Sequence, residues 1–183
     1  MQRADHDLAF LLRYENIAWY ENGKVKILDR RVYPAKIEFV TCRTHQEVAQ
    51  AITDMVTQSA GPYTAVPMGM ALAAHECREK TAAVQMDHLR RAAHTISHAR
   101  PTTVKRMALL CDLCLAEAER ALAAGEDTAQ AIVNKTVELN NTRYERVAKI
   151  GKYLVDLFPE NGTVMTHCFA ETCLLYTSDA ADE

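Results

Sequence analysis

A cysteine near the end of the chain stands where a reactive side chain could act. The run TVMTHC at residues 163–168 is rich in β-branched residues and predicts a short buried strand that ends at Cys168. Side chains alternate along a strand, so Thr166 and Cys168 share one face while His167 points to the other, which disfavours a His167–Cys168 dyad. At the carboxyl end of a first α/β strand, Cys168 would lie where ligands bind in such folds. A buried core thiol is the alternative.

An arginine at a predicted helix start is the second candidate. Arg100 precedes Pro101, which suits the first position of a helix. Backbone N–H groups and the helix dipole favour anions at such a place, so Arg100 is a candidate ligand for a phosphate, and Thr102 and Thr103 could add contacts. The alternative is a solvated arginine beside the helix.

Cysteine and histidine spacings do not predict a metal site or a cofactor. Cys111 and Cys114 lie on one face of a predicted helix and could bind a metal only if two further ligands converged, so an apolar stripe is the simpler interpretation. The remaining candidates lack zinc-like spacing and are expected to be surface or satisfied helix residues: His75, Cys77, His88, His94 and His98.

Composition narrows the class of protein. The 183 residues are 49% hydrophobic and 25% charged, enough for one good core or two small ones, and the net charge is −3. No apolar run is long enough to span a membrane, and no secretory signal is recognisable. Six dispersed cysteines then indicate reduced thiols in the cytoplasm. Basic residues are spread out, which argues against a nucleic-acid partner.

The elements that must position these residues begin with a β-rich part, residues 14–42. IAWY and KVKILD flank Glu21-Asn22-Gly23, a strong hairpin signal, and KIEFVTC alternates as a third strand. From residue 44 the hydrophobic period is helical, and the run from Thr44 to Glu47 fits a capping box.

Four more helical segments follow, and then the strand that ends at Cys168. Their patterns cover residues 64–80, 81–99, 101–124 and 126–158, with Gly125 closing the third of them. We therefore predict a helix-rich α/β chain: an N-terminal α/β and helical domain over 1–160, then the first strand of a truncated Rossmann-like domain over 161–172.

Four motifs occur in one order along the chain: NGKVKILDRRVYP, EFVTCRTHQEVAQAITDM, ARPTTV and NGTVMTHC. In this order and spacing they resemble the S-methyl-5-thioribose-1-phosphate isomerases, relatives of the regulatory subunits of translation initiation factor 2B and of ribose-1,5-bisphosphate isomerases. The resemblance implies a homodimer whose active site lies between the two domains. It also implies metal-free conversion of an aldose 1-phosphate to a ketulose 1-phosphate in methionine salvage, by a cysteine and an aspartate.

The resemblance also assigns residues. It makes Cys168 catalytic and Arg100 substrate-binding, and it places a second substrate-binding loop at Gln58, Ser59 and Ala60; Thr166 joins them as the neighbour of Cys168 on its face of the strand. In that loop Gln58 stands where the family has arginine and Ser59 where it has glycine. These departures favour an isomerase for a different pentose or deoxypentose phosphate, or a non-catalytic regulatory subunit.

The final residues, CLLYTSDAADE at 173–183, match nothing in that family and resemble one reading frame of a sequencing adapter. The protein would then end after its first Rossmann strand, without the catalytic aspartate. A strand without neighbours exposes unpaired backbone groups. We therefore expect the 183-residue chain to lack isomerase activity and to aggregate.

Overall fold

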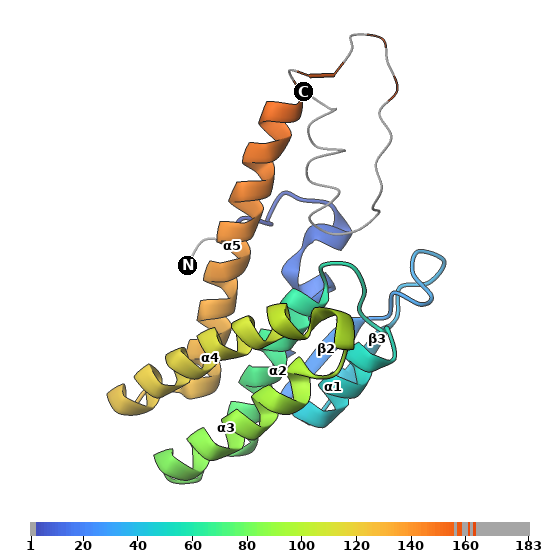
Figure 1. The fold of residues 1–183 in the computed structure, drawn as a ribbon. Helices are drawn as coiled ribbons and strands as arrows, with labels where there is room; N and C mark the ends of the chain where they lie inside the picture. The colour runs from blue at the N-terminus through green and yellow to red at the C-terminus, as the bar shows by residue number, and fades with distance from the viewer. Residues whose placement is uncertain (1–2, 156, 159–160, 162, 164–183) are drawn as a thin grey trace.

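A small antiparallel sheet packs against a block of helices in the computed structural model, which describes residues 3–155, 157–158, 161 and 163 (Figure 1). This part of the chain is a helix-rich α/β structure, as predicted, while the expected Rossmann-like strand lies almost wholly outside it. The elements are β1 (Ala18–Glu21), β2 (Lys24–Leu28), β3 (Phe39–Cys42), α1 (His45–Thr53), α2 (Pro62–Glu76), α3 (Ala82–Ser97), α4 (Val104–Ala124) and α5 (Thr128–Val155), with 3-10 turns at Phe10–Leu12, Tyr14–Asn16 and Pro101–Thr103.

The hairpin prediction is confirmed. Strands β1 and β2 pair antiparallel with Glu21 opposite Lys24, and the two residues between them have positive φ, 49° at Asn22 and 72° at Gly23. Left-handed backbone at both positions is what a two-residue hairpin turn requires, and Asn-Gly tolerates it. Strand β3 joins the other edge of β2, antiparallel, to give the order β1-β2-β3.

The helix cap predicted at Thr44 is also present. Its hydroxyl accepts the backbone N–H of Glu47 at 3.2 Å, and α1 starts at the next residue. The Glu47 carboxylate accepts the N–H of Arg43 at 2.5 Å, one residue before the cap rather than at the cap itself. Both N–H groups are satisfied by side chains, which fixes where α1 begins.

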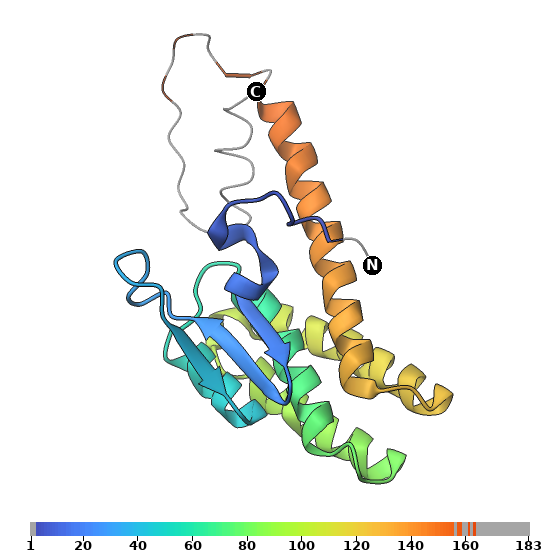
Figure 2. The same cartoon turned by 180° about the vertical axis from the view of Figure 1, so that it is seen from behind.

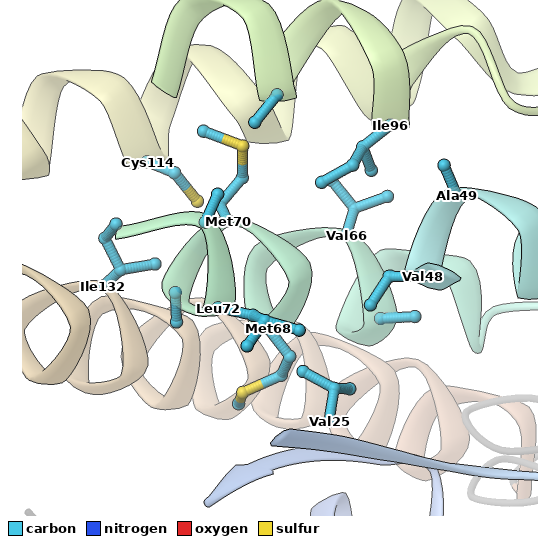
Figure 3. Close-up of a cluster of buried hydrophobic side chains, with 14 of the residues drawn as sticks. Val25, Val48, Ala49, Val66, Met68, Met70, Leu72, Ile96, Cys114 and Ile132 are labelled. Carbon is cyan, nitrogen blue, oxygen red and sulfur yellow. The ribbon is translucent and has the colours of Figure 1, made fainter. Parts of the chain in front are cut away.

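Helix α2 is the centre of the core. Every residue from Thr64 to Ala74 is buried, and the helix contacts β1, β2 and all four other helices. In Figure 3, Met68 lies toward Val25 of the sheet, whereas Met70 lies toward Cys114. A helix that is apolar on every face must be enclosed, and α2 is. It starts two residues earlier than its pattern predicted, because Pro62 suits the first helical turn.

The N-terminal segment packs along α5 and forms a second, smaller core (Figure 2). The Tyr144 hydroxyl donates to the carbonyl of Leu12 at 2.7 Å, and the ring of Tyr14 meets that of Tyr144 edge to face, with centroids 5.1 Å apart. Helix α4 ends at Gly125, whose φ is 68°, as the sequence predicts. Within the described residues, no helix combines the length and the apolar character needed to cross a membrane.

Candidate functional site

Arg100 joins the end of α1 to the residue just before the loop that the resemblance assigns to substrate binding. Its Nη2 group donates to the carbonyls of Ile52 and Thr57, both at 2.9 Å. One residue earlier, the carbonyl of Ala99 accepts the hydroxyl of Thr53 at 2.9 Å. These bonds hold the turn before Pro101 against residues 52–57, immediately before the loop at 58–60.

The guanidinium of Arg100 is half-buried and hydrogen-bonded, rather than solvated as the alternative interpretation had it. Burial lowers the pKa of Arg100, but an arginine starts so far above neutrality that it stays charged. Its buried Nε has no hydrogen-bond partner among the residues that the structure describes. A buried N–H without an acceptor is costly, so this donor favours an anionic or carbonyl-bearing ligand.

The loop itself is a tight turn between α1 and α2. Gln58 is half-buried, and its side-chain amide donates to the carbonyl of Met55 at 3.2 Å, while its own carbonyl accepts the N–H of Gly61 at 2.9 Å. Ser59 is exposed with φ of 52°, and Ala60 is half-buried. The structure therefore bonds Arg100 to Thr57, the residue next to this loop, although the two are some forty positions apart in the sequence.

Replacing Ser59 with glycine is expected to raise the free energy of unfolding by up to about 1 kcal/mol, since a left-handed backbone costs a residue with a Cβ roughly 1–2 kcal/mol and the entropy of glycine in the unfolded chain offsets part of that. Urea denaturation measures the change. Ala60→Gly is the matched control: its φ is not positive, so this variant should lose stability. Equal changes in the two variants would contradict the strain at Ser59.

Arginines from two other helices gather at the same end of α2. The guanidinium of Arg106, on α4, lies 5.3 Å from the ring centre of Tyr63, and an Nη of Arg143, on α5, lies 3.4 Å from the hydroxyl of Thr64. Both line a groove of about 440 Å³ between α4 and α5, together with Tyr63 and Arg146. Sequence reasoning missed this groove; the only local signal was the spacing of Arg143 and Arg146, one helical turn apart.

The paired cysteines of α4 are core residues, as the apolar-stripe interpretation predicted. Cys111 and Cys114 are both buried against α2 and α3. Burial raises the pKa of Cys111 to about 12 and raises that of Cys114 as well, so both thiols are protonated at neutral pH. Burial thus favours the protonated thiol over the nucleophilic thiolate at both positions.

Two predicted site residues, Thr166 and Cys168, lie outside the described residues. Their roles stay predictions, as does the placement of the catalytic strand. Residues 173–183 also lie outside the described residues, so their interpretation as a sequencing adapter stays a prediction.

Known proteins resemble this chain over most of its length. It is 29% identical over 152 residues to the methylthioribose-1-phosphate isomerase of Natranaerobius thermophilus and 31% identical over 159 residues to that of Roseiflexus castenholzii, which covers 81% and 83% of this chain. The chain spans 44% of the length of each of these curated relatives.

Two solved structures share the fold. The delta subunit of translation initiation factor eIF-2B from A. fulgidus superposes with a TM-score of 0.66 at 25% identity, over 88% of this chain and 46% of that one. The 5-methylthioribose 1-phosphate isomerase from Pyrococcus horikoshii superposes with a TM-score of 0.61 at 25% identity, over 86% of this chain and 44% of that one.

The sequence pattern of a single family covers most of the chain. The model of the initiation factor 2 subunit family matches residues 59–183, a range that takes in the loop 58–60 from its second residue, Arg100, and the predicted catalytic strand. The motif resemblance, the relatives and the fold agree with this family, although the match also runs through residues 173–183, which the motif resemblance left outside it. The chain belongs to the initiation factor 2 subunit family.

Proposed function

We propose that this chain is part of a sugar-phosphate isomerase of the methylthioribose-1-phosphate isomerase type, converting an aldose 1-phosphate to a ketulose 1-phosphate in methionine salvage or a related pentose-phosphate salvage. The observation that carries the proposal is the hydrogen bond from Arg100 to the carbonyl of Thr57, the residue just before the loop 58–60, beside an arginine that contacts the start of α2. Curated relatives named for that isomerase activity support it. Because the chain spans 44% of their length, the activity is proposed for the whole protein.

The substrate class sets the chemical task. In an aldose 1-phosphate the anomeric oxygen carries the phosphate, so the sugar cannot equilibrate freely with its aldehyde. The enzyme must protonate the ring oxygen to open the ring, and then move a hydrogen from C2 to C1, with no net gain or loss of atoms. We assign the second task to Cys168 and an aspartate, as the resemblance implies, with Thr166 beside the thiol.

Cationic side chains of the described residues would bind the phosphate. Arg100 offers its buried Nε, and the groove offers Arg106, Arg143 and Arg146 within reach of the same end of α2. Arginine suits phosphate because its planar N–H groups can bind two oxygens at once. The proposal includes a homodimer and a cytoplasmic location for the whole protein.

A non-catalytic regulatory subunit is the second candidate function. It is favoured by the superposition on the eIF-2B delta subunit and by the neutral Gln58, whose amide donates to the carbonyl of Met55. A changed pentose or deoxypentose phosphate would also accommodate the missing loop charge, because fewer or weaker phosphate contacts can be offset elsewhere in the pocket.

Steady-state assays of the whole protein against several pentose and deoxypentose 1-phosphates separate these functions. We expect turnover of at least one substrate, a loss of roughly 10²–10⁴-fold in kcat for Cys168→Ser, and no turnover by the 183-residue chain. Cys77→Ala, at a buried thiol near the far end of α2, should keep its activity. No turnover by well-folded whole protein, or full turnover by Cys168→Ser, would favour the regulatory subunit or another mechanism.

A further inference from the structure

Three helices bring two imidazoles and a carboxylate together at a place that the proposed isomerase site does not use. His45 is the first residue of α1, Glu76 is the last of α2, and His88 lies in the middle of α3. One carboxylate oxygen, Oε2 of Glu76, lies 2.6 Å from Nδ1 of His45 and 3.0 Å from Nε2 of His88. All three ligand atoms are within 4.8 Å of one another.

The cluster is held in place before any ligand arrives. The N–H of His45 donates to the second carboxylate oxygen, Oε1 of Glu76, at 2.6 Å, so the carboxylate is fixed at the start of α1. The cap at Thr44 fixes the backbone of His45, and its ring meets that of His88 edge to face with centroids 5.1 Å apart. Ligand atoms positioned by three packed helices lose little entropy when a ligand binds.

The carboxylate is charged and reachable. Burial by itself would raise the pKa of Glu76, but the hydrogen bonds from the ring and backbone of His45 and from the ring of His88 outweigh it, and the pKa is lower than usual. The side chain of His45 is 5% exposed, whereas those of Glu76 and His88 are 20% and 24% exposed. The site therefore has a closed inner side and an outer side open to solvent.

Two imidazole nitrogens and one carboxylate oxygen are the ligand set of many three-residue metal sites with an open position. In tetrahedral zinc, with bonds of about 2.0–2.2 Å, neighbouring ligand atoms are about 3.3 Å apart. The distances of 2.6 Å and 3.0 Å from the two nitrogens to Oε2 of Glu76 would need to lengthen by about 0.7 Å and about 0.3 Å, which requires the side chains to rotate. Calcium and magnesium are disfavoured, because they prefer oxygen ligands throughout.

We propose that His45, Glu76 and His88 bind a zinc-type divalent cation, with solvent completing its coordination on the exposed side. The cation would replace the two hydrogen bonds that now converge on Oε2 of Glu76, and it would join α1, α2 and α3. This site is independent of the proposed isomerase function, since it lies on other residues and needs no sugar phosphate.

Two other histidines of the chain could also bind a divalent cation, and the test must exclude their contribution. His94, in the last turn of α3, and His98, the residue after its end, are both exposed, with their rings stacked and the centroids 4.1 Å apart, and could bind a cation without a built site. Their double variant His94→Ala/His98→Ala therefore serves as the background. Cobalt(II) serves as the probe beside zinc, because its visible absorption reports the coordination geometry and a thiolate ligand adds an intense near-ultraviolet band.

The test titrates the whole protein, rather than the 183-residue chain that is expected to aggregate, with zinc and cobalt by calorimetry and absorption. One equivalent should bind to the wild type and to the background variant with similar affinity, without a thiolate band, and zinc should raise Tm in both. Glu76→Gln and His88→Gln in that background should each weaken binding at least tenfold, since even residues that only support a metal ligand contribute roughly 10–100-fold.

Each variant must keep its fold for its metal affinity to be compared. Circular dichroism without metal checks the fold of each variant; if Glu76→Gln unfolds, His88→Gln decides, because it leaves the His45–Glu76 bonds in place. Undiminished binding by His88→Gln, loss of binding in the background variant, or a thiolate band in the cobalt complex would each overturn the proposal.

Discussion

Replacing Gly69 with valine is expected to lower the free energy of unfolding by about 3 kcal/mol. Gly69 lies in the middle of α2, where α1 and α3 both approach. A Cβ at this position would lie 2.9 Å from Cγ1 of Val48 and 3.1 Å from Cδ1 of Ile96. The first contact is closer than real Cβ atoms come, and Val48 is β-branched and buried, so the helices themselves must move apart.

Gly69→Ala separates packing from helix propensity. Alanine favours a helix interior over glycine by about 1 kcal/mol, so its smaller clash is partly offset, and we expect a net loss below that of valine. Val48→Ala removes the atom that a new Cβ would meet. In a double-mutant cycle measured by urea denaturation, Gly69→Val and Val48→Ala should therefore couple favourably. Additive effects, or a Gly69→Val protein as stable as the wild type, would contradict this account of the α1–α2 contact.

Local signals were enough to predict most element boundaries. The Asn22-Gly23 turn, the Thr44 cap and the Gly125 helix end each depend on residues within a few positions, and each is present in the structure. The central position of α2 was not predicted. Its run of small and apolar residues, including Gly69, indicates burial on all sides, but only the packed structure shows which elements enclose it.

In the candidate sites, too, local sequence motifs pointed to single residues but not to the contacts between segments far apart in the chain. The motif around Arg100 singled out this arginine, but its bonds to the carbonyls of Ile52 and Thr57 join segments more than forty residues apart and leave no spacing to recognise. Spacing along the sequence gave no indication of a metal site at His88 or at the other histidines near it. His45 and His88 instead meet through Glu76, from three different helices, so spacing arguments could not find them.

Replacing Arg100 with alanine is expected to lower the free energy of unfolding by about 2–3 kcal/mol, because two hydrogen bonds from a charged donor are lost and the carbonyl of the buried Thr57 loses this partner, whereas that of Ile52 keeps the N–H of Met55. Arg100→Lys keeps the charge without the planar donor group and should recover only part of the loss. Arg90→Ala, at an exposed position on α3, is the matched control and should change stability by less than about 0.5 kcal/mol. Chemical denaturation measures all three.

Measuring KM in the whole protein distinguishes a structural role of Arg100 from a role in binding phosphate. If the arginine only joins α1 to Thr57, the activity of Arg100→Lys should fall only when the variant unfolds. Its KM should be normal at temperatures where it is folded. If the buried Nε also binds the substrate, KM for the phosphorylated sugar should rise roughly tenfold or more in folded Arg100→Lys, about the cost of one charged hydrogen bond. We expect the second result, because a buried donor without a partner is costly unless a ligand provides one. An unchanged KM would show that Arg100 has only a structural role. The arginines of α4 and α5 would then be the remaining candidates for binding the substrate phosphate.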